Sequence, residues 1–133
     1  MAQLDRLFIE KGEREKLYDK IEIFGEKSRK EQFLFAMAFG FKNKIKRPLG
    51  TKEGFFLTKD LRVEDEALMD IVAVYDTGSA DILSDRGEVF KIAEEYAHAS
   101  IHLLHEKISS IEYGSFNKYF ERYLYETLNG IEH

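Results

Sequence analysis

The residues best suited to bind a metal ion lie in one stretch of the last third of the chain. Glu94, His98, His102 and Glu106 follow one another at intervals of four. In a helix, residues spaced by four lie on one face about 5–6 Å apart. Two imidazoles with one or two carboxylates are a common ligand set for divalent transition metals. The H-E-x-x-H motif of zinc proteases is absent, because Ala99 follows His98.

Two interpretations of this stretch stay open. The first is a small metal-dependent enzyme that uses His98, His102 and neighbouring glutamates. The second is a solvated helix face or an interface, because Glu and His side chains paired at the surface are common and contribute little. We take the second as the working hypothesis and predict neither a resident metal nor a cofactor.

A second cluster of functional groups is cationic. The segment FKNKIKRPLG carries four positive side chains within six residues, although the chain has a formal net charge of −5. From Lys42 to Arg62 there are seven Lys or Arg and only two acids. Cations at a helix C-terminus complement the helix dipole, but one or two suffice for that. We therefore predict contact with nucleic acid or an anionic partner through Lys42, Lys44, Lys46, Arg47 and Lys52. Two alternatives remain for these cations: they serve solubility alone, or they contact the acidic face of another copy of the chain.

The C-terminal segment FNKYFERYLYETL is rich in aromatic residues. Aromatic side chains at helical spacing are usually part of a core. Tyrosine is also enriched at protein interfaces, because it joins an apolar ring to a polar end. Tyr119, Tyr123 and Tyr125 are therefore candidates for a partner interface or a homodimer contact.

Composition excludes several classes of function. The absence of cysteine excludes disulfides, thiolate nucleophiles and cysteine-ligated zinc. No nucleophile elbow and no glycine-rich phosphate loop is present, so we predict no catalytic residue. The longest apolar run, FLFAMAFGF, is far shorter than the roughly 20 residues of a membrane span. The first residues do not resemble a signal peptide, so the expected location is the cytoplasm.

Apolar periodicity predicts the elements that position these groups. We expect one domain over residues 1–133, mainly α, built as a compact bundle of about five helices. Ser28 and Glu31 fit a capping box that starts the most apolar of these helices. The short segments RLFIE and FFLT could pair as a two-stranded ribbon on the helical body. The helices are expected at 12–24, 29–41, 64–76, 85–108 and 116–128.

Three segments then give a family resemblance. FLFAMAFGFKNKIKRPL, LMDIVAVYDTGSADIL and FKIAEEYAHASIHLL, between residues 33 and 104, are similar in order and spacing to the DNA phosphorothioation-associated protein 4 family and its archaeal relatives. The shared features are an alanine-rich helix ending in glycine, a basic loop ending in Pro-Leu, an acid before Thr77, and Glu-Glu-Tyr-Ala. The chain departs from the family at Asp76, where Glu is usual, and at His98, Ala99 and Ser100, where Asn-Gly-Gly is usual.

The resemblance implies a setting and no reaction, since none of its motifs is catalytic. It implies an accessory protein of a DNA modification or defence system that works beside other sulfur-modification proteins. Together with the basic segment, it predicts a non-enzymatic binding protein that contacts DNA or an acidic partner. A metal-dependent enzyme and a structural oligomer subunit are the alternatives.

Overall fold

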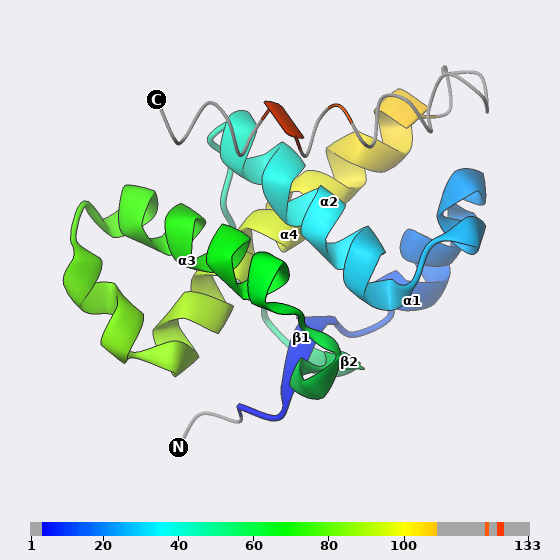
Figure 1. The fold of residues 1–133 in the computed structure, drawn as a ribbon. Coiled ribbons are helices and arrows are strands. Elements are labelled where there is room, and N and C mark those ends of the chain that lie inside the picture. The colour runs from blue at the N-terminus through cyan, green and yellow to red at the C-terminus, as the bar shows by residue number, and fades with distance from the viewer. Residues whose placement is uncertain (1–3, 109–121, 123–124, 127–133) are drawn as a thin grey trace.

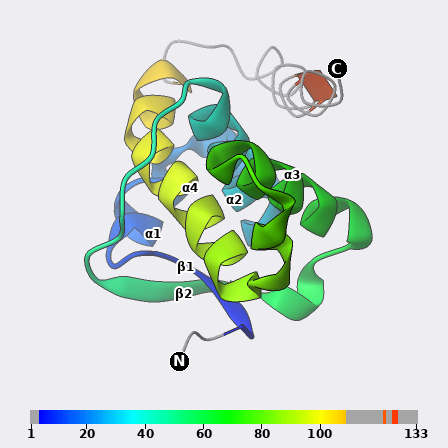
Figure 2. The same cartoon turned by 90° about the vertical axis from the view of Figure 1, so that its left-hand side faces the viewer.

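The computed structural model describes residues 4–108, 122, 125 and 126. Its body is formed by three long helices, which are α2 (Arg29–Lys42), α3 (Val63–Thr77) and α4 (Arg86–Ile108). Two antiparallel strands, β1 (Arg6–Glu10) and β2 (Lys52–Leu57), lie at one end of these helices (Figures 1 and 2). The predicted mainly α fold with a small ribbon is therefore confirmed. The helix expected at 116–128 falls almost wholly outside the described residues.

Helix α2 lies at the centre of the core and starts as the sequence predicts. The Glu31 amide donates to the Ser28 hydroxyl at 3.2 Å, and the Ser28 amide donates to the Glu31 carboxylate at 3.0 Å. These two bonds satisfy amides that a helix start otherwise leaves unpaired. All residues from Gln32 to Gly40 are buried. A helix that is apolar on every side is covered on every side, as the sequence predicts.

The continuous helix expected at 12–24 is wrong. The chain forms a single α-turn, α1 (Glu13–Lys16), followed by two 3₁₀ helices, Tyr18–Lys20 and Glu22–Glu26. Ile21 between them is extended, with φ −85° and ψ 99°. A 3₁₀ helix places residues three apart on one side. Tyr18, Ile21 and Phe24 have that spacing, and all three are buried.

The ribbon pairs Arg6 with Leu57 and Glu10 with Lys52, and it contains a bulge. Leu7 lies opposite Phe56 while Phe8 lies opposite Gly54, so Phe55 is the extra residue. A bulge turns adjacent side chains away from strict alternation. Both Phe55 and Phe56 are buried as a result.

Short 3₁₀ segments connect the remaining elements. Thr58–Asp60 leads from β2 to α3, and Ala80–Ser84 leads from α3 to α4. Gly78 ends α3 in the left-handed region, with φ 76°, which favours glycine. Among the described residues, no helix combines the length and the apolar character that crossing a membrane requires.

Candidate functional site

The segment between α2 and β2, residues 43–51, carries most of the predicted cations, and we call it the basic loop. It leaves α2 at Asn43, whose side-chain amide donates to the Phe39 carbonyl at 2.8 Å. Lys44 then takes a left-handed conformation with φ 56°. The loop runs alongside α4 (Figure 2), where the Arg47 amide donates to the Glu95 carbonyl at 3.1 Å. One backbone bond thus fixes the middle of the loop to the longest helix.

Glu10, the last residue of β1, holds the far end of the basic loop. Its carboxylate accepts the Thr51 amide at 2.8 Å and the Gly50 amide at 2.6 Å. These bonds favour the ionised form, so they lower the pKa of Glu10. The Lys11 amide also donates to the Thr51 carbonyl at 2.7 Å. Because both its middle and its end are anchored, the loop presents its side chains from defined positions.

Lys46 is paired with a carboxylate of the same chain. Its Nζ lies 3.1 and 3.0 Å from the two carboxylate oxygens of Asp76. The Tyr96 hydroxyl donates to the same carboxylate at 2.5 Å, and the Lys46 Nζ lies 5.8 Å from the centre of the Tyr96 ring. Burial and the bond to Asp76 raise the pKa of Tyr96. The three segments that carry the family resemblance therefore meet at these three side chains.

The other predicted cations differ in how they are engaged. Lys42 lies 3.5 Å from the Glu126 carboxylate, and Lys52 lies over the Phe8 ring at 5.7 Å. Lys44 and Arg47 are exposed. In the part of the chain that the structure describes, neither makes an ion pair. These two remain available to an external anion.

The four residues of the alternative metal site are not brought together as a whole. His98 and His102 do lie side by side, with ring centres 6.5 Å apart. Glu106 is exposed. Glu94 turns toward the ribbon instead, where its carboxylate accepts the Phe8 amide at 2.9 Å. Sequence spacing thus identifies the histidine pair and misassigns its acids.

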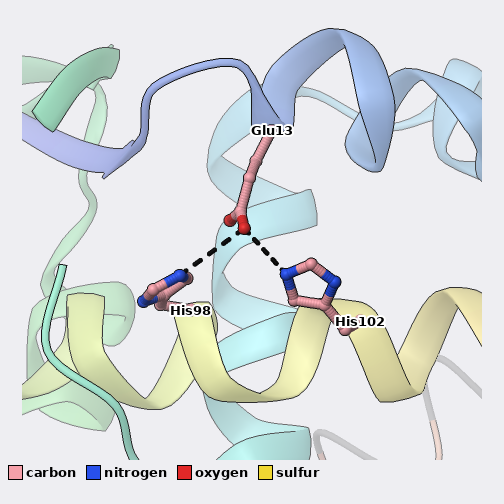
Figure 3. A group of neighbouring side chains, drawn as sticks. All are labelled: Glu13, His98 and His102. Atoms are coloured by element: carbon pink, nitrogen blue, oxygen red, sulfur yellow. Dashed lines mark hydrogen bonds and ion pairs between the residues drawn. The ribbon is translucent and has the colours of Figure 1, made fainter. Parts of the chain in front are cut away.

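The acid that joins the histidines is Glu13, the first residue of α1. Figure 3 shows its carboxylate directed from α1 to the space between the two imidazoles on α4. Its Oε2 lies 2.8 Å from His102 Nε2 and 3.5 Å from His98 Nε2. One donor atom from each residue lies within 4.8 Å of the other two. Glu13 and His98 are buried, whereas the His102 side chain is 53% exposed.

Two further groups surround His98. Its Nδ1 lies 3.3 Å from the Arg47 carbonyl oxygen in the basic loop. Its Nε2 lies 3.9 Å from Oε1 of Glu10. The same imidazole thus faces the basic loop on one side and two carboxylates on the other. No sequence signal points to Glu10 or Glu13 as partners, because each is separated from His98 by more than 80 residues.

Glu94 forms a second titratable centre, in the lining of a cavity of about 300 Å³. Its side chain is buried against Phe8, and Lys52 and Lys91 line the same cavity. Burial raises the pKa of Glu94 to about 7, although the Phe8 amide and Lys52 act in the opposite direction. The solvated helix face expected from sequence is therefore wrong at Glu94, and equally at His98.

The predicted aromatic interface is described only in part. Tyr119 and Tyr123 lie outside the described residues. Tyr125 is 67% exposed. A role in an interface stays a prediction for all three.

Comparison with known proteins identifies a family. The model of a family described as DNA sulphur modification system-associated protein 4 matches residues 13–124. No curated protein and no solved structure matches the chain. The matched range includes Glu13, the basic loop, His98 and His102.

Proposed function

The chain belongs to the DNA sulphur modification system-associated protein 4 family, and we propose that it is a non-catalytic binding component of such a system. In this proposal the basic loop contacts the phosphate backbone of DNA in the cytoplasm. The contacts come from Lys44 and Arg47, and other proteins of the system supply the chemistry.

The observation that supports this function is the contrast within the basic loop. Lys46 is neutralised by Asp76 at 3.0 Å, while Lys44 and Arg47 are exposed and make no ion pair among the described residues. Both lie on a backbone that is anchored to Glu95 and Glu10. An anchored loop binds with a smaller loss of conformational entropy than a mobile one. Two exposed and unpaired cations on such a loop can each contact a backbone phosphate.

Two phosphate contacts set the size of the expected effect. Each neutralised phosphate contributes a slope of about −0.9 to the dependence of log affinity on log salt concentration. The basic loop alone would therefore give a slope of about −1.8. Such binding is weak and independent of sequence, which fits one contact within a larger assembly.

The test is a double charge reversal, Lys44→Glu with Arg47→Glu. We expect the variant to lose about tenfold or more in affinity for duplex DNA at low salt and to lose most of its salt dependence. Fluorescence anisotropy of a labelled duplex over a salt series measures both quantities.

A matched control reverses Lys16 and Lys20, two exposed lysines elsewhere in the chain. It has the same net charge as the test variant and should bind DNA nearly as well as the parent. Equal losses in both variants would show that net charge, not the basic loop, governs binding. A parent protein that binds no DNA at low salt would overturn the proposal in favour of an acidic protein partner.

A further inference from the structure

We infer that Glu13, His98 and His102 form a binding site for one divalent transition-metal ion, with Zn²⁺ as the probe of choice. This inference goes beyond the proposed function and does not depend on it. It differs from the alternative set considered from the sequence, because Glu13 replaces Glu94 and Glu106 as the acidic ligand.

The donor atoms are close to the arrangement that zinc requires. Zinc bonds of about 2.0–2.2 Å in tetrahedral geometry place neighbouring donor atoms about 3.3 Å apart. Glu13 Oε2 lies 2.8 Å from His102 Nε2 and 3.5 Å from His98 Nε2. The donor nitrogens of the two histidines lie within 4.8 Å of each other, so rotation of these side chains would complete the geometry. Three protein ligands leave one position for water, and the exposed side of His102 provides access to it.

The hydrogen bonds of His98 also call for a cation at this point. The Arg47 carbonyl can only accept, so the Nδ1 of His98 at 3.3 Å is the donor. In a neutral imidazole the Nε2 is then an acceptor, and it faces the Glu13 carboxylate, which also only accepts when ionised. A proton on Nε2 satisfies both atoms, and a metal ion bound between them does so as well. A ring N–H donated to a backbone carbonyl is the usual outer contact of a metal-bound histidine.

Charge and hydrogen bonding at the carboxylates support the same conclusion. Within the described residues, neither Glu10 nor Glu13 forms an ion pair with Lys or Arg. The Oε1 atom of Glu13 is buried and finds no hydrogen-bond partner in the described part of the chain. An unpaired buried carboxylate oxygen is costly, and a bound cation removes this cost.

The site would also connect metal binding to the basic loop. His98 contacts the Arg47 carbonyl, and Glu10, 3.9 Å from the same imidazole, accepts two amides of the loop. An ion that fixes His98 therefore fixes the surface from which Arg47 extends. The ion has a positioning role in this arrangement, and no reaction is assigned to it.

The experiment uses protein prepared without a histidine tag and stripped of metal with EDTA. Calorimetric titration with ZnCl₂ should show one equivalent bound per chain, and the bound zinc should raise Tm. The His102→Ala variant should bind zinc about 100-fold more weakly, because it lacks one ligand. His102 is half exposed, so this variant should keep the parent's circular dichroism spectrum.

The matched control is His105→Ala, which removes a histidine of the same helix that lies outside the cluster. It should retain the affinity of the parent. Cobalt substitution gives a second measurement, since visible absorption should be present in the parent and lost in Glu13→Gln. The inference is overturned if the parent binds no stoichiometric zinc, or if His102→Ala binds it as tightly as the parent. If Glu13 and the two histidines are held together by shared protons alone, the parent would bind no stoichiometric zinc.

Discussion

Replacing Gly40 with alanine is expected to destabilise the protein by about 2 kcal/mol, although alanine is the better helix former. A Cβ at this position would lie 2.3 Å from the Tyr96 carbonyl oxygen and 3.2 Å from Ser100 Cβ. The first of these contacts is with backbone, which cannot move away as a flexible side chain can. Alanine gains about 1 kcal/mol of helix propensity over glycine. Overpacking costs about 1–3 kcal/mol, and we expect the upper end because the clash is severe.

Urea denaturation of the parent and the Gly40→Ala variant measures this difference. Gly25→Ala is the control, because a Cβ there would meet no described atom within 4 Å, and a change of less than about 0.5 kcal/mol is expected. Equal stability of the parent and Gly40→Ala would mean that α2 and α4 are not in close contact at this point. The outcome also matters for function. Separation of the two helices at Gly40 would displace Tyr96 and the start of the basic loop together.

The sequence predicts those parts of the fold that depend on short-range rules. The capping box of Ser28 and Glu31, the buried character of α2 and the pairing of RLFIE with the strand around Phe55 are all found. The prediction fails at residues 12–24, where the apolar stripe of a helix and that of consecutive 3₁₀ turns use nearly the same spacing. Burial of Tyr18, Ile21 and Phe24 selects the second. Only the surrounding elements could decide between them.

The candidate site shows the same limit more clearly. The spacing of His98 and His102 brings their rings together on α4, as expected. The sequence favours a solvated face for Glu94 and His98, because Glu and His side chains paired at a helix surface are common. Helix α4 instead contacts α2, α3 and β1, so that more than one side of it is covered. Burial on several sides, and the approach of Glu13 from α1, arise from tertiary structure and leave no local signal.

The three segments that carry the family resemblance are in contact in the folded protein, which gives a physical reason why they occur together. Lys46 comes from the basic loop, Asp76 from the end of α3 and Tyr96 from α4. A carboxylate that accepts from both a lysine and a tyrosine joins the three segments in one small network. Lys46 thereby holds the loop in place, while Lys44 and Arg47 extend from it. In the basic loop, Lys46 has a structural role, while Lys44 and Arg47 are available for binding. The sequence alone does not distinguish these roles.

The second large effect is expected for Glu94→Gln, which should stabilise the protein at pH 8 by about 3 kcal/mol. Burial raises the pKa of Glu94 from 4.5 to about 7 in the folded state. Between these values the folded protein keeps a proton that the unfolded chain releases. The contribution of Glu94 to stability therefore falls as pH rises from about 4.5 to about 7, and stays low above that. Glutamine is neutral at every pH and can still accept the Phe8 amide.

Free energies of unfolding for parent and Glu94→Gln, measured in urea from pH 4 to pH 8, test this expectation. The two proteins should be nearly equal in stability at pH 4 and should diverge as the pH rises, because only the parent must bury a charge. Lys52 lies close enough to favour the ionised form, and Glu95 opposes it, so both must be left unchanged. Glu26→Gln removes one negative charge from an exposed position and serves as the matched control for the loss of a charge alone. A constant difference between parent and Glu94→Gln would mean that this carboxylate is hydrated in solution, and that the contact between α4 and β1 is looser than the structure shows.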